Sequence, residues 1–271
     1  QDTKNYAAMV SMVDREVGNV LDLLHELGLE DNTIVFFTGD NGGQDRFKSK
    51  EHPRGFFGPN VSPENGVEFR GGKGNLYEGG LKIPFLVRWP GVVAANTVRD
   101  LVFYQPDIMA TIADLTNTKA PEDTDGISIA PTLLGADGSQ KLHEMMYWEY
   151  GNQTAVRYGK WKAIQPGKPK GSKQNQPWEL YDLSKDMSES TSVADSHPDV
   201  LEKMQVFADA SHAPVEAGTY YDKSRERHER DRKAKWGTLR DDQSRLENIK
   251  RIPKHDIVPF EEMKLIRFSS E

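Results

Sequence analysis

An amphipathic pattern that leads directly into a short apolar segment is the feature that most constrains the fold. Apolar side chains recur at steps of three and four residues from Tyr6 to Leu27, and Gly28 follows the last of them. This spacing predicts a helix with Gly28 as its C-terminal cap. The apolar segment 33–37 then predicts a buried strand. A helix that leads at once into a strand is typical of half a parallel α/β unit.

Polar residues suited to a cation stand where this predicted strand ends. Asp40 and Asn41 come directly after it and are followed by Gly42 and Gly43. In an open α/β sheet, ligands bind at the carboxyl ends of the strands. Both side chains offer the hard oxygen atoms that calcium or magnesium prefers. The same residue types also dominate tight turns, so a simple turn is the alternative interpretation.

A lysine framed by glycines follows about 30 residues later. Lysine suits a compact anion as a point charge on a flexible stem. Glycine lets the backbone approach such an anion closely. Lys73 therefore predicts an anion site beside the cation site. We interpret Arg70 and Glu78 as a structural ion pair that holds this loop. The glycines of the frame are Gly71, Gly72, Gly74, Gly79 and Gly80.

The next segments predict one more strand and one more helix. The apolar segment 83–89 contains Pro84, which restricts it to the start or the edge of a strand. A helical pattern covers 108–115, and Pro106 is well placed in its first turn. His143, before the next segment, is interpreted as structural.

Short aromatic segments then predict an antiparallel meander with a final helix. Segments 145–150, 154–158, 161–164 and 179–183 have strand-like composition, and Pro198 begins a helix near 199–210. The aromatic side chains are interpreted as the core of this subdomain, with stacking on a sugar ring as the alternative. They are Tyr147, Trp148, Tyr150, Tyr158 and Trp161.

These patterns divide the chain into three parts. We expect an α/β part over 1–138, a small antiparallel subdomain with a packed helix over 139–219, and a charged extension over 220–271. The extension is interpreted as a solvated helix or disordered arm, and a basic arm for a polyanion is the alternative.

Composition excludes several classes of function. The 271 residues hold 42 acidic and 35 basic side chains, for a formal net charge of −7, which disfavours nucleic acid as a partner. The absence of cysteine excludes disulfides, thiolate metal sites and a cysteine nucleophile in this chain. No apolar run reaches the roughly 18 residues of a membrane span, so no transmembrane segment is expected.

The segments 38–43 and 70–84, in this order and spacing, resemble the sulfatase family of the alkaline-phosphatase superfamily. Segments 87–91, 158–162 and 179–183 support the resemblance, which extends to about Ala210. It implies an α/β fold: an alkaline-phosphatase-like sheet with flanking helices, present in part. A small antiparallel β subdomain with a C-terminal helix would follow.

The resemblance also implies a chemistry. Asp40 and Asn41 would ligate a divalent cation, usually calcium with magnesium possible, and Lys73 would contact the sulfate as a catalytic and substrate-binding residue. The substrate would be a sulfate ester of a small molecule or a glycan. A formylglycine hydrate, made within a Cys/Ser-x-Pro-x-Arg motif, would attack the sulfur. A periplasmic or secreted location is implied.

The sequence departs from the family pattern in ways that bear on activity. It has no cysteine and no Ser-x-Pro-x-Arg, the nearest segment being 196–200, which ends in Val200. The two upstream aspartates of the family have no counterpart, and Gln44 stands where many relatives carry a histidine. We therefore expect the C-terminal half of an arylsulfatase-like enzyme, inactive alone, whose partner is the missing N-terminal half.

Two other functions stay open at this point. A phosphodiesterase or phosphonate monoester hydrolase of the same superfamily would use a similar metal site. A non-catalytic sulfatase-like protein would bind an anionic glycan. His52, in the polar loop before Lys73, is interpreted as solvated, with a substrate contact as the alternative.

Overall fold

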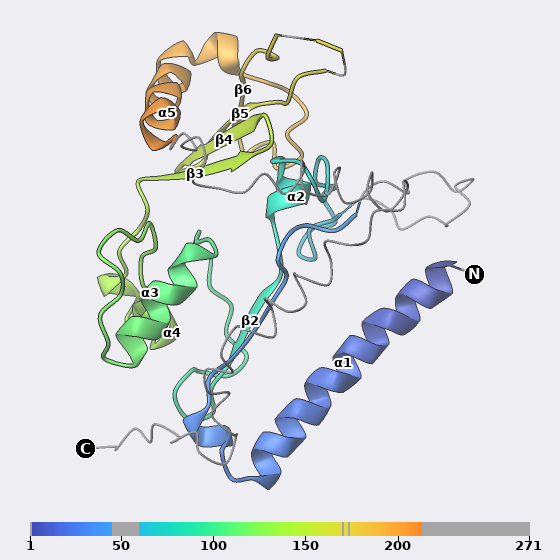
Figure 1. Ribbon diagram of the computed structural model, residues 1–271, viewed down its shortest axis with the longest axis vertical. Helices are drawn as coiled ribbons and strands as arrows, with labels where there is room; N and C mark the ends of the chain where they lie inside the picture. Colours follow the sequence, from blue (N-terminus) through green and yellow to red (C-terminus); the bar gives the residue numbers. More distant parts are fainter. Residues whose placement is uncertain (1, 45–59, 170, 173, 213–271) are drawn as a thin grey trace, which may run out of the picture. The chain divides into compact units, whose positions relative to one another are not determined.

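The computed structural model describes residues 2–44, 60–169, 171–172 and 174–212 (Figure 1). The elements below all belong to one compact unit, Gln1–Ser211. His52 and the predicted extension 220–271 lie outside the described residues. In the described part of the chain, no helix is both long and apolar enough to cross a membrane.

The first helix, α1, spans Asp2–Glu26, as the apolar spacing predicts. Gly28 follows it with φ +65°, the left-handed conformation that favours glycine. The Gly28 N–H donates to the His25 carbonyl and the Leu29 N–H donates to the Leu24 carbonyl, both at 2.9 Å. This pair of bonds is a Schellman motif, so the predicted cap is confirmed.

A two-stranded sheet follows the turn Glu30–Asn32 (η1). Strand β1 spans Val35–Thr38 and strand β2 spans Phe85–Arg88, which begins directly after Pro84 as predicted. The two strands pair antiparallel, with Phe37 opposite Leu86, so the predicted parallel unit is wrong for this pair. A parallel neighbour needs a crossover, usually helical, whereas the described part of this connection holds loops and the four-residue helix α2, Glu78–Leu81.

The segment between the two sheets is organised around a buried aspartate. Helix α3 spans Pro106–Leu115, as predicted, and is followed by α4, Ala130–Leu133, and by the turn η2, Asp137–Ser139. The fully buried Asp107 accepts hydrogen bonds from the Tyr104 N–H at 2.9 Å and the Ile127 N–H at 2.7 Å. Its carboxylate also lies 2.8 Å from His143 Nε2, a contact that agrees with the predicted structural role of that histidine.

The second sheet is the predicted antiparallel meander, in the order β3-β4-β5-β6. Helix α5 packs Met204 and Ala208 against Val156, Ala163 and Leu180. The strands are β3 Met145–Tyr150, β4 Gln153–Tyr158, β5 Trp161–Gln165 and β6 Glu179–Asp182, and the turn η3 Ala194–Ser196 precedes α5, Pro198–Ser211.

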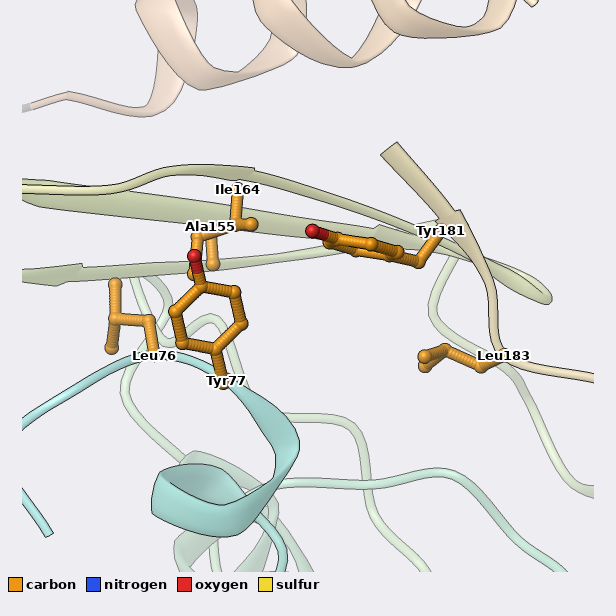
Figure 2. Packing of buried hydrophobic residues seen from close by; sticks show 6 residues of the cluster. All are labelled: Leu76, Tyr77, Ala155, Ile164, Tyr181 and Leu183. Carbon is orange, nitrogen blue, oxygen red and sulfur yellow. The ribbon is translucent and has the colours of Figure 1, made fainter. Parts of the chain in front are cut away.

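The opposite face of this sheet is covered by the segment that leads into α2. Leu76 and Tyr77 pack there with Ala155, Ile164 and Tyr181, on the side of the sheet away from α5 (Figure 2). The sheet thus joins the segment after Lys73 to the small subdomain. Four of the five aromatic side chains predicted to form the core do pack against it: Tyr147, Trp148, Tyr158 and Trp161, whereas Tyr150 is exposed.

Candidate functional site

The two sequence motifs meet through their backbones. The Lys73 N–H donates to the Gly43 carbonyl at 2.8 Å, and the Gly42 N–H donates to the Gly80 carbonyl at 2.9 Å. The Asn60 side-chain amide bridges the same loops, because its Nδ2 donates to the Gly43 carbonyl at 3.1 Å and to the Gly79 carbonyl at 2.8 Å. Segments separated by about 30 residues therefore form one unit.

The close backbone contacts in this region leave no room for a Cβ, so they require glycine. A Cβ on Gly42 would overlap the Gly79 carbonyl oxygen, and a Cβ on Gly79 would overlap the Gly71 carbonyl oxygen. A Cβ on Gly80 would overlap the Asn75 carbonyl oxygen. The glycines that frame the lysine thus allow backbone to approach backbone within the protein, which the sequence pattern alone did not indicate.

The three predicted site residues line one broad cavity of about 2170 Å³. Asp40 is exposed and lies just after the end of β1, with Gly39 between them. The Gly39 carbonyl accepts a hydrogen bond from Gln105 Nε2 at 2.9 Å. Asn41 is half-buried, and its Nδ2 donates to the Gly42 carbonyl at 3.0 Å. Lys73 is exposed at the tip of its loop.

These donors fit one part of a hard-cation site. A carboxylate and an amide oxygen are suitable ligands, but calcium takes about six to eight oxygens. Among the described residues, no group of three or more histidine, aspartate or glutamate side chains could hold a metal ion. Asp40 and Asn41 would therefore need further ligands from elsewhere.

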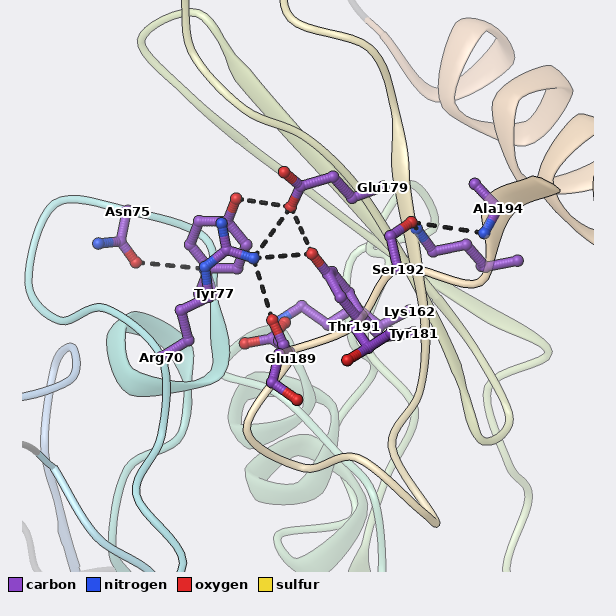
Figure 3. Close-up of polar contacts among 12 residues, drawn as sticks. Arg70, Asn75, Tyr77, Lys162, Glu179, Tyr181, Glu189, Thr191, Ser192 and Ala194 are labelled. Atoms are coloured by element: carbon purple, nitrogen blue, oxygen red, sulfur yellow. Dashed lines mark hydrogen bonds and ion pairs between the residues drawn. The ribbon is translucent and has the colours of Figure 1, made fainter. Parts of the chain in front are cut away.

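A network of polar contacts ties the lysine loop to the small sheet (Figure 3). Arg70 Nη1 lies 3.2 Å from Glu179 Oε2 and donates to Tyr181 Oη at 2.7 Å and to the Glu189 carbonyl at 3.0 Å. The Arg70 guanidinium also covers the Tyr77 ring, 3.9 Å from its centroid. The predicted ion pair between Arg70 and Glu78 is therefore wrong, since Arg70 pairs with Glu179.

Glu78 pairs instead with a buried lysine of β5. Lys162 Nζ lies 2.8 Å from Glu78 Oε1 and 2.9 Å from Glu189 Oε1, and all three side chains are buried. Burial raises the pKa of the Glu78 carboxyl, but the Lys162 ammonium outweighs it and holds this pKa below its ordinary value. Burial raises the pKa of Glu189, with the adjacent Glu78 carboxylate acting in the same direction.

Two tyrosine hydroxyls complete the network as donors. Tyr77 Oη and Tyr181 Oη both donate to Glu179 Oε2, at 2.7 and 2.6 Å. Burial and this hydrogen bond to a carboxylate raise the pKa of both tyrosines. Both hydroxyls therefore stay protonated, and Glu179 accepts from both while pairing with Arg70.

The sequence did not indicate these partners. Lys162 and Glu78 are 84 residues apart, and Arg70 and Tyr181 are 111 apart, so no local periodicity connects them. The segments 158–162 and 179–183 were singled out only as supporting the family resemblance. Both segments indicated the family, but the sequence did not show that they hold the lysine loop.

Comparison with known proteins identifies two family models. The model described as "Sulfatase" matches residues 1–118, and the model described as "N-sulphoglucosamine sulphohydrolase, C-terminal" matches residues 71–210. The second match covers more than half of the chain and includes Lys73, Glu78 and the strands that hold the lysine loop.

Individual relatives agree with these models. The chain is 35% identical over 209 residues to the N-acetylgalactosamine-6-O-sulfatase of Bacteroides thetaiotaomicron, covering 72% of this chain and 39% of the relative. It is 31% identical to human arylsulfatase A, covering 71% of this chain and 40% of the relative. The chain thus spans about two fifths of the length of these curated relatives.

A solved structure shares the fold. Its description concerns the metabolism of multiple glycosaminoglycans by Bacteroides thetaiotaomicron, and it aligns with a TM-score of 0.59 and 32% identity. The alignment covers 73% of this chain and 42% of that structure.

Proposed function

Because the chain belongs to the sulfatase family, we propose that it carries the metal-facing and sulfate-facing part of a sulfuric ester hydrolase. One observation carries this proposal: the Lys73 N–H is bonded to the Gly43 carbonyl, so the lysine loop is fixed beside Asp40 and Asn41. A cation and an ammonium group would then face the same anion.

The residues of this chain suit the charge changes of the reaction. Cleavage of a sulfate ester at the S–O bond places negative charge on the sulfate oxygens and on the leaving oxygen. Lys73 would bind and orient the sulfate, and its ammonium group would stabilise the developing charge. A divalent cation held by Asp40 and Asn41 would supply further stabilisation of this charge.

We assign Asp40 and Asn41 as two ligands of that cation. The sulfatase family is generally metal-dependent. Calcium is the proposed ion, because it accepts oxygen ligands in a flexible geometry, whereas magnesium demands a nearly octahedral shell. The other ligands and the formylglycine nucleophile would come from a further sulfatase segment, since this chain has no Cys/Ser-x-Pro-x-Arg motif. The chain alone would have no turnover.

We further propose that the substrate is a sulfated glycan. The bacterial relative is named for a sulfated amino sugar, and the aligned structure comes from a study of glycosaminoglycan metabolism. A periplasmic or secreted location would match such a substrate. The predicted boundaries near residues 138 and 219 belong to the same proposal.

Hydrolysis assays on a joined protein test the proposal. The 271-residue chain would be placed behind the nucleophile-bearing segment of the Bacteroides thetaiotaomicron relative, with formylglycine installed, and assayed with sulfate and phosphate esters. We expect calcium-dependent hydrolysis that favours sulfate. Lys73→Ala should lower kcat/KM by about 100-fold or more, the scale of losing one group that stabilises transition-state charge.

Lys168→Ala is the matched control, because Lys168 is an exposed lysine of the β5–β6 loop and does not line the cavity. It should leave kcat/KM unchanged. A joined protein that unfolds cooperatively but hydrolyses neither ester would overturn the proposal. Preference for phosphate would support a phosphodiesterase or phosphonate hydrolase instead.

A further inference from the structure

We propose that Glu189 is a positioning residue for Lys73: it holds both ends of the loop 70–78 against the small antiparallel sheet. This inference rests on the proposed function in so far as Lys73 faces the substrate. The contacts themselves are independent of it (Figure 3).

The first end of the loop is held through Arg70, three residues before Lys73. Arg70 Nη1 donates to the Glu189 backbone carbonyl at 3.0 Å. The same nitrogen contacts Tyr181 and Glu179 on β6, so the guanidinium is fixed from the small sheet. A planar guanidinium with several partners has little freedom to move.

The second end is held through Glu78, five residues after Lys73. The Glu78 backbone N–H donates to Glu189 Oε2 at 2.6 Å. The other oxygen, Glu189 Oε1, lies 2.9 Å from Lys162 Nζ without hydrogen-bond geometry, and Lys162 in turn pairs with the Glu78 side chain at 2.8 Å. One residue thus contacts both ends of the loop, through its carbonyl and through its carboxylate.

The backbone at Glu189 supports this role. Its side chain is fully buried, and its φ of +52° lies in the left-handed region that residues with a side chain seldom adopt. Such a conformation persists only where the surroundings fix the residue, and it is common where a site is held in place. Burial and the nearby Glu78 carboxylate also raise the Glu189 pKa, and the Lys162 ammonium opposes this shift.

Between the two held ends, the loop presents Lys73 outward. Lys73 and Gly74 are exposed, whereas Leu76 to Gly80 are buried. A substrate-binding group is effective only when its support limits its movement. Loss of the Glu189 contacts should therefore loosen the loop tip and weaken sulfate binding, although Glu189 touches no substrate.

Hydrogen exchange on the 271-residue chain tests the first half of the proposal without any activity. We expect Glu189→Ala to speed amide exchange in segment 71–80 by at least tenfold, while β4 and β5 keep their protection. Asp182→Ala is the matched control: it removes a carboxylate of the same sheet whose hydrogen bonds, among the described residues, are with Lys160 at 2.8 Å and with Ser184. It should leave segment 71–80 unchanged.

Equal exchange in wild type and Glu189→Ala would overturn the proposal, and so would a uniform increase over the whole sheet. If Glu189→Ala does not fold, Glu189→Gly removes the same carboxylate while relaxing the left-handed backbone, and the same comparison applies.

Kinetics on the joined sulfatase test the second half. Glu189→Ala should raise KM at least fivefold while kcat changes less, and it should add nothing further in a Lys73→Ala background. Additive losses in the double variant would overturn the positioning role. If the joined wild type has no activity, the proposed function fails, while the exchange experiment still decides whether Glu189 holds the loop.

Discussion

At the scale of single residues, the geometry of this site depends on glycines, because a residue with a Cβ would not fit there. Gly42, Gly79 and Gly80 bring three backbone segments into direct contact, and the Lys73 and Gly42 amides bond across the junction. A side chain at Gly42 would push the turn 40–43 away from segment 79–80, whereas one at Gly79 or Gly80 would distort segment 70–80 itself. The position of Lys73 relative to Asp40 therefore depends on residues that contribute no chemistry themselves.

A single methyl group tests this dependence. Gly79→Ala should destabilise the chain by about 1–3 kcal/mol, the usual cost of forcing an extra carbon into a filled space. Its control is Gly138→Ala, because a Cβ there meets no atom within 4 Å. That change should stay within about 0.5 kcal/mol. Urea unfolding of both variants measures the difference, and equal midpoints would contradict the close contact at Gly79.

At the scale of elements, the sequence predicted features that depend on neighbouring residues but not contacts between residues far apart in the chain. Helix α1, its glycine cap, the proline before β2 and the aromatic meander were all predictable, because each depends on neighbouring residues. The antiparallel pairing of β1 with β2 was not, since strand direction depends on where a long connection returns. The partners of Arg70 and Glu78 were missed for the same reason: they lie on β5, on β6 and after it.

The two glycines of the first helical segment should respond to alanine in opposite ways. Gly28 has φ +65°, so Gly28→Ala should destabilise the end of α1 by about 1 kcal/mol. Gly18 lies inside α1 with open space around its Cβ position, so Gly18→Ala should stabilise the helix by up to about 1 kcal/mol. Thermal unfolding followed by far-UV circular dichroism measures both. A stabilising Gly28→Ala would contradict the left-handed cap.

Two features of the whole molecule support the proposal that a further sulfatase segment is needed. The apolar side chains of α1 are exposed in the described residues, including Met9, Val20 and Leu23. An exposed apolar face on a helix usually marks a surface that another segment covers. The proposed cation site would be similarly partial, because Asp40 and Asn41 offer two oxygen donors where calcium takes about six to eight. Both features agree with the proposed need for a further sulfatase segment.

Calcium titration tests this central claim most directly. By isothermal titration calorimetry, the 271-residue chain should bind calcium with a Kd no tighter than about 1 mM, the weak end of protein calcium sites. The joined protein should bind at least 100-fold more tightly and lose that affinity in Asp40→Ala. Micromolar binding by the 271-residue chain alone, abolished by Asp40→Ala, would contradict the account, because it would show a complete metal site within this chain.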